Sequence, residues 1–280
     1  MIAIMKKQIW FYLSVVFVAL SGCGPKQFYE TTQTGLQYYF FDKNKDGKMG
    51  NVGDIYSVNI TVCTDKLDTV VYSQFVMFQR NEPVYPGDFH EGLGMLHEKD
   101  SVSFKLHVDS FFRMHNLGIP KDVESDSLFR LHIGVVSIMT PKEHFVFKCQ
   151  EELGNMKEFV TRKGWEVTSD STGIMYEVVT SNPEGDQLQM GDSVELKYTY
   201  STLDDRIIER TRENDRWKFE VGSFQTRVSG LTRILTLMRD GEKVRSVIPF
   251  AEAFGPEGMG PLIPPYTTIV LEIEAYKLKQ

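Results

Sequence analysis

Apolar and polar positions alternate through much of the second half of the chain, which predicts a sheet. Between positions 193 and 200 every second residue is apolar: Val194, Leu196, Tyr198 and Tyr200. Such alternation is typical of a half-buried strand. Further strands are expected over 216–222, 243–250 and 267–278. Apolar spacings of three and four predict a short helix over 231–238. This order indicates the α+β class, an antiparallel sheet wrapped on a short helix.

The chain contains an internal repeat. TGLQYYFF begins at Thr34 and TGIMYEVV at Thr172, and this offset of 138 residues holds without a gap to Thr61 and Thr199. Two later segment pairs continue the match: 91–102 with 233–244, and 129–135 with 269–275. Because a repeated sequence indicates a repeated structural unit, we expect the first half to adopt the fold of the second.

A helix is predicted between the two copies. Within 141–165, helical spacing relates the apolar residues Cys149, Leu153, Met156 and Val160, and Gly164 follows two basic residues as a helix end. We therefore expect a diverged domain over 34–140, a helical linker over 141–171 and a second domain over 172–280.

The first 22 residues are expected to be a signal peptide. Lys6 and Lys7 precede a short apolar run, and LSGC, which ends at Cys23, follows it. This box resembles the lipobox of bacterial lipoproteins, in which cleavage before the cysteine leaves it as the lipid attachment site. Residues 23–33 would then form a tether, with the protein lipid-anchored in the cell envelope and facing the periplasm. A plain secretory signal is the alternative.

Composition and charge narrow the possible partners. The chain is 41% hydrophobic and 25% charged, as in ordinary globular proteins. Its net charge of −7, without a basic cluster, argues against nucleic-acid binding.

Cys63 and Cys149 fall in a predicted strand and a predicted helix, where two buried free thiols are expected. The 6 histidines lack metal-ligand spacing, so neither a metal nor a cofactor is expected.

DKNKDGKMG, residues 42–50, begins as a calcium-binding EF-hand loop does, with Asp42, Asn44 and Asp46 ahead of a glycine. However, Gly53 stands where the loop would need its last glutamate, and the flanking segments predict strands. The repeat counterpart, TSNPEGDQL, keeps only the glycine. A polar turn between two strands is therefore favoured, and a calcium module stays as a third functional alternative.

The second copy resembles the FKBP family of peptidyl-prolyl isomerases. The resemblance covers about 172–279 and rests on GDSVELKYTY, VSGLTRILTLMRDGEKVRSVIP, AFGPEGMGPLIPP and TIVLEIE. The first copy looks like a diverged unit of the same family, most similar at FHEGLGMLHEKD. The resemblance implies two FKBP-like domains joined by a helix. It also implies catalysis without a nucleophile, in which an apolar pocket holds the X-Pro amide twisted.

The resemblance also implies where that pocket lies. Its catalytic positions are Tyr198, Glu209, Trp217, Val228, Phe254 and Ile263, and its further substrate-binding positions are Ile208, Leu231, Leu262 and Leu271. Val228 would offer its backbone N–H to a substrate carbonyl. Phe254 stands where the family carries a tyrosine that donates to the ligand. Ile208, Leu231 and Leu271 replace aromatic residues.

The first copy departs further from the family. Ile60 replaces the pocket tyrosine and Val71 the acid, while Phe89 and Phe112 remain. Residues 113–127, with a single Ile119-Pro120, replace the flap, so no catalysis is expected there. The predicted function is prolyl isomerisation, with weakened activity, in proline-containing exported polypeptides. The alternative is a non-catalytic chaperone or assembly factor that binds peptides while tethered to the lipid membrane through Cys23.

Overall fold

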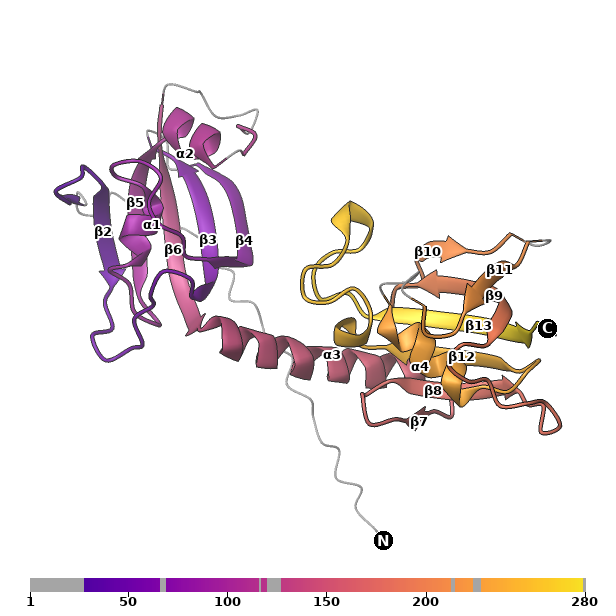
Figure 1. The fold of residues 1–280 in the computed structure, drawn as a ribbon. Helices are drawn as coiled ribbons and strands as arrows, with labels where there is room; N and C mark the ends of the chain where they lie inside the picture. Colours follow the sequence, from indigo (N-terminus) through magenta and orange to yellow (C-terminus); the bar gives the residue numbers. More distant parts are fainter. Residues whose placement is uncertain are drawn as a thin grey trace, which may run out of the picture. The chain divides into compact units, whose positions relative to one another are not determined.

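The computed structural model describes residues 28–65, 69–115, 117–119, 127–212, 215–223 and 228–278. The chain divides into two compact units, one ending at Ile138 and the other beginning at Met139 (Figure 1). Each unit holds an antiparallel sheet and short helices, so the predicted α+β class is confirmed. In the described ranges, no helix combines the length and the apolar character that crossing a membrane requires.

The first unit is a six-stranded antiparallel sheet in the order β1-β2-β5-β6-β3-β4. Its strands are β1 (Glu30–Thr31), β2 (Gln37–Asp42), β3 (Ile55–Thr64), β4 (Val70–Gln79), β5 (Ser101–His107) and β6 (Leu128–Met139). Two short helices accompany them, α1 (Phe89–Leu93) and α2 (Val108–Met114). The alternating apolar residues of the strands bury one face of the sheet, and α1 adds Leu93 to the same core.

The second unit repeats this strand order. Its sheet runs β7-β8-β12-β13-β9, and β10 and β11 both pair with β9. The strands are β7 (Thr168–Ser169), β8 (Met175–Thr180), β9 (Ser193–Ser201), β10 (Ile207–Arg210), β11 (Trp217–Glu220), β12 (Lys243–Ile248) and β13 (Ile269–Lys277). Its helices are α3 (Pro141–Lys163), α4 (Ser229–Leu237) and the 3-10 turns η1 (Phe250–Glu252) and η2 (Gly260–Leu262). Helix α4 packs its apolar stripe on the sheet, as its spacing predicts.

Matching hydrogen bonds support the sequence repeat. The side-chain amide of Asn44 donates to the carbonyl of Glu98 over 2.9 Å. Its counterpart Asn182, at the same offset as the first segment pair, donates to the carbonyl of Asp240 over 2.7 Å. Both copies therefore fix the turn after their first long strand to a later turn through the same side chain.

The same contacts favour a turn at the segment that begins like a calcium loop. Besides donating through its nitrogen, the Asn44 side chain accepts the backbone N–H of Asp46 over 3.3 Å. Asp42 is the last residue of β2. An asparagine that bonds its own loop in this way is characteristic of turns.

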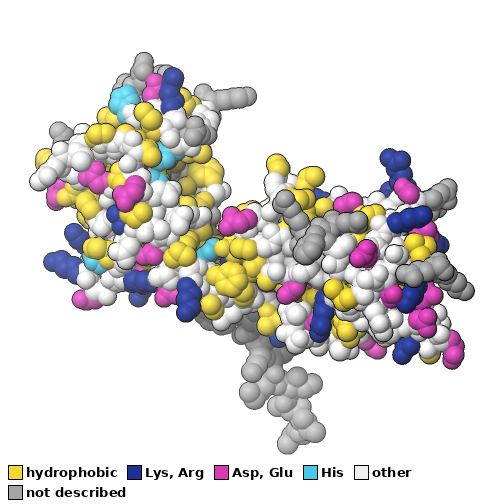
Figure 2. All heavy atoms as spheres, viewed as in Figure 1, with side chains coloured by type: hydrophobic (Ala, Val, Ile, Leu, Met, Phe, Trp, Pro, Cys, Tyr) yellow, Lys and Arg dark blue, Asp and Glu magenta, His cyan; other side chains and the backbone are white. Residues whose placement is uncertain are grey.

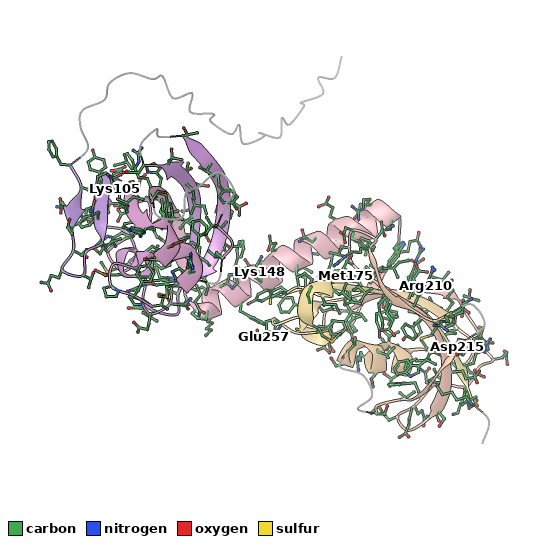
Figure 3. The ribbon with its side chains drawn as sticks, turned by 90° about the horizontal axis from the view of Figure 1, so that it is seen from above. Lys105, Lys148, Met175, Arg210, Asp215 and Glu257 are labelled. Carbon is green, nitrogen blue, oxygen red and sulfur yellow. The ribbon has the colours of Figure 1, made fainter. Side chains whose placement is uncertain are left out.

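Helix α3 begins and ends as its sequence predicts. Thr140 and Glu143 form a capping box at its start, and Gly164 ends it in the left-handed conformation at φ 64°. Its C-terminal half packs on the outer face of the second sheet, through a cluster of Met156, Phe159, Val160, Met175, Val247 and Val270. Figure 3 shows Met175 beside this helix.

The expectation of two buried thiols is wrong for one cysteine. Neither described cysteine forms a disulfide, and Cys63 is buried in β3. Cys149 is only half-buried, because it lies on α3 outside the cluster that holds the helix to the sheet.

Two helix glycines give contrasting predictions for stability. A Cβ at Gly230 of α4 would lie 2.5 Å from Ile248 Cγ2, so Gly230→Ala is expected to destabilise the second unit by about 1–3 kcal/mol through overpacking. A Cβ at Gly154 of α3 would meet nothing within 4 Å. Gly154→Ala should therefore stabilise by roughly 0.5–1 kcal/mol. Urea unfolding measures the change in the free energy of unfolding for each variant. A change of the same sign in both variants would contradict the prediction.

Candidate functional site

A hollow of about 900 Å³ opens in the second unit where its edge strand is interrupted. In the first unit β4 runs 10 residues along β3. In the second unit two short strands take this place, β10 and β11, and residues 211–216 separate them. The backbone N–H of Thr211 still bonds the Tyr198 carbonyl over 3.0 Å. From β9, the side chains of Tyr198 and Tyr200 line the hollow.

Seven of the ten positions predicted for the pocket line this hollow: Tyr198, Ile208, Glu209, Trp217, Val228, Phe254 and Ile263. The Tyr198 and Trp217 rings meet nearly edge to face, with centroids 5.6 Å apart. Trp217 also contacts Phe219, with centroids 4.7 Å apart. Such aromatic contacts fix the rings and leave an apolar wall toward the hollow.

Tyr198 and Glu209 form a hydrogen-bonded pair within this wall. The Tyr198 hydroxyl donates to Glu209 Oε1 over 2.6 Å, from β9 to β10. Burial, the bond to Glu209 and the negative charge of Glu209 raise the pKa of Tyr198. The hydroxyl therefore stays protonated at neutral pH and remains committed to Glu209.

Val228 lies at the junction between loop and helix. It is the residue before α4, with extended backbone at φ −92° and ψ 93°, and its side chain is buried. Val228 lines the hollow. Donation of its N–H to a substrate carbonyl stays a prediction.

The structure places the other three predicted positions outside the lining. Leu231 and Leu271 are 1% and 0% exposed and belong to the core between α4 and the sheet. Leu262 is 65% exposed in η2, and its carbonyl accepts a hydrogen bond from Arg206. Spacing alone does not separate a core leucine from one at a pocket floor, because both lie on the inner face. Their contact with substrate stays a prediction.

Sequence reasoning missed three uncharged side chains in the hollow, Tyr200, Thr211 and Met259. The alternation along β9 put Tyr200 on the face of Tyr198, which was the available signal. Met259 lies in the turn before η2, where no periodicity marks a direction.

Charged side chains also line the hollow, and we call this part of the lining its rim. The described residues there are the cationic Arg210, Arg212, Arg216 and Lys218 and the anionic Glu209 and Asp215. Figure 2 shows basic and acidic side chains mixed over β10 and β11, and Figure 3 labels Arg210 and Asp215. With four cationic and two anionic side chains, the described part of the rim carries a net positive charge, although the chain as a whole carries −7.

The corresponding positions of the first unit fill its core. Ile60, Val71, Phe89 and Ile119 are partly buried and pack against that core, and Phe112 is buried within it. Pro120 lies outside the described residues. The absence of catalysis in this unit stays a prediction.

Comparisons with known proteins bear on the second unit. Residues 185–276 match the family model of FKBP-type peptidyl-prolyl cis-trans isomerases, which confirms the resemblance stated from the sequence. The chain is 25% identical over 141 residues to a probable FKBP-type peptidyl-prolyl cis-trans isomerase of Haemophilus influenzae. It is 26% identical over 161 residues to the FKBP-type 22 kDa peptidyl-prolyl cis-trans isomerase of Escherichia coli.

These matches are partial. The alignments cover 50% of this chain and 57% of the Haemophilus protein, and 57% of this chain and 74% of the Escherichia protein. A solved structure of a peptidyl-prolyl cis-trans isomerase from Pseudomonas syringae is 29% identical. It matches 47% of this chain and 96% of its own, at a TM-score of 0.40.

Proposed function

We propose that the second unit, which carries the FKBP-type peptidyl-prolyl cis-trans isomerase match, accelerates cis-trans isomerisation of X-Pro bonds in other polypeptides. The observation that carries the proposal is the apolar hollow in which Tyr198, Trp217 and Phe254 converge with Ile263. A proline ring is small and apolar, and it fits a wall of this kind.

The chemistry requires no nucleophile. Isomerisation of an amide crosses a barrier of about 18–20 kcal/mol because the planar form is stabilised by resonance. An apolar wall solvates the planar, charge-separated amide poorly, so the twisted amide is bound more tightly than the planar one. Tyr198, Trp217 and Phe254 would enclose the ring, and the Val228 N–H would hold the preceding carbonyl.

A non-catalytic peptide-binding role is the second candidate. It is favoured by the aliphatic and thioether parts of the wall, Ile208, Met259 and Ile263, and by the lack of a hydroxyl on Phe254. Such a wall binds apolar segments without holding one amide in a defined twist. This candidate would act as a membrane-tethered chaperone or assembly factor.

The proposal extends to export and anchoring. The basic start, apolar run and LSGC box support a signal peptide and a lipid on Cys23, with proline-containing exported polypeptides as clients at the cell envelope. Residues 1–27 lie outside the described part of the chain. Labelled fatty acid should enter the wild-type chain and not Cys23→Ser, and equal labelling of both would remove the anchor.

The deciding experiment measures isomerisation of proline tetrapeptides by the full-length chain in detergent. We expect the second unit to raise the isomerisation rate above the spontaneous rate. Changing both Tyr198 and Phe254 to Ala should return the rate to the spontaneous value. No rate above the spontaneous one would reject catalysis. If the double variant still suppresses aggregation of an unfolded client, that result would instead favour the chaperone.

The cationic rim predicts a preference among these peptides. A glutamate next to the proline should raise kcat/KM about 2- to 5-fold over alanine, and a lysine should lower it, because opposite charges attract across the rim. The difference should shrink at 1 M salt, where screening acts over about 3 Å. Equal kcat/KM for the three peptides at low salt would contradict the prediction.

A further inference from the structure

Tyr200 occupies an unusual place in the hollow. It lies on β9 two residues after Tyr198, and the two ring centroids are 5.2 Å apart. Its backbone pairs with Leu271 of β13. Its side chain lines the hollow, yet only 7% of the residue is exposed. Tyr200 is therefore part of both the wall of the hollow and the core beneath it.

The hydroxyl of Tyr200 is buried and has no hydrogen-bond partner among the described residues. Buried polar groups in folded proteins nearly always have a partner, because an unmade hydrogen bond destabilises the fold. The neighbouring carboxylate in the wall, Glu209, accepts from Tyr198. An orphan hydroxyl on a side chain that lines the hollow therefore requires an explanation.

The protonation state of Tyr200 suits a donor. Burial, followed by the neighbouring Tyr198 and Glu209, raises the pKa of Tyr200. The hydroxyl thus keeps its proton at neutral pH. Since it is shielded from solvent, a hydrogen bond made at this position does not compete with water.

We propose that the Tyr200 hydroxyl donates a hydrogen bond to a backbone carbonyl of the proline peptide bound in the hollow. The inference rests on the proposed function, because it takes the ligand to be such a peptide. It makes Tyr200 the donor of a wall in which Phe254 has no hydroxyl and Tyr198 is committed to Glu209. Peptide carbonyls are acceptors only, so a protonated phenol is complementary to them.

Tyr200→Phe is the direct test, since it removes one oxygen atom and keeps the ring. We expect kcat/KM for a proline tetrapeptide to fall about 3- to 10-fold and the Kd, measured calorimetrically, to rise by a similar factor. We also expect the melting temperature to stay constant or rise, because the variant loses an unpartnered buried hydroxyl. A purely structural role predicts the opposite combination, with lower stability and unchanged binding.

Tyr85→Phe is the matched control. The Tyr85 hydroxyl, in the first unit, is also buried without a partner among the described residues, so the same atom is removed from the same kind of environment. It should change neither kcat/KM nor Kd. Phe254→Tyr added to Tyr200→Phe should recover part of the lost binding, because it returns a hydroxyl to the wall.

The outcomes separate this inference from the proposed function. Wild-type binding and turnover retained in Tyr200→Phe would overturn the role of Tyr200 while leaving the isomerase intact. A wild-type chain that binds the peptide without accelerating it would overturn catalysis, and the change in Kd would still decide on Tyr200. A wild-type chain that neither binds nor isomerises the peptide would overturn both.

Discussion

Trp217→Ala is expected to lower the kcat/KM of the second unit for a proline tetrapeptide by about 30- to 150-fold. The indole forms one wall of the hollow and is held there by Tyr198 and Phe219. Removing an aromatic anchor from the centre of a binding site typically costs about 2–3 kcal/mol. Each 1.4 kcal/mol corresponds to about a factor of ten. The measurement is the rate of cis-trans exchange under substrate-limited conditions.

Trp165→Ala supplies the control within the same unit. Trp165 packs edge-on against Phe159, with ring centroids 5.3 Å apart. The Arg245 guanidinium carbon lies over the Trp165 ring, 4.6 Å from its centroid. It does not belong to the lining of the hollow. This variant should lose stability and keep its kcat/KM once folded. A folded Trp217→Ala with wild-type kcat/KM would show that substrate does not bind in the hollow.

The sequence predicted the elements of this site better than its shape. Alternation along 193–200 and the helical spacing of 231–238 gave β9 and α4 almost to the residue, because each has one buried face. The split between β10 and β11 had no comparable signal. The polar run between them is compatible with any loop, and its effect on the hollow depends on pairing of both strands with the distant β9.

The same limit explains which predicted side chains the structure places outside the lining and which lining side chains were overlooked. Leu231 and Leu271 lie on the inner face that the pattern gave them, but that face continues from the hollow into the core. Tyr200 shares the inner face as well, and the folded structure shows that it lines the hollow. Periodicity determines a face, whereas neighbours from remote segments determine whether that face is open.

The buried carboxyl of Glu152 carries the second large expected effect. Both the Phe250 N–H and the Thr268 hydroxyl donate to its Oε1, over 2.7 and 2.6 Å, which holds α3 to the second sheet. Glu152→Ala leaves both donors without this acceptor, so it should reduce the free energy of unfolding by about 2–5 kcal/mol. Glu151→Ala is the matched control. Glu151 is exposed and forms a surface ion pair with Lys148, so its loss should cost less than about 1 kcal/mol.

The pH dependence of stability separates the titration of the Glu152 carboxyl from its role as a hydrogen-bond acceptor. Burial raises the pKa of Glu152 above its ordinary value of 4.5, against the two hydrogen bonds, which lower it. The folded state therefore holds the proton more tightly than the unfolded state. This contribution to stability is complete below pH 4.5 and is lost as the pH rises through the folded-state pKa. Glu152→Gln keeps an acceptor oxygen and cannot titrate, so its stability should lack this loss. Urea unfolding from pH 4 to 8 gives the stability of the wild type and of Glu152→Gln at each pH. Parallel curves of stability against pH would mean that Glu152 titrates normally.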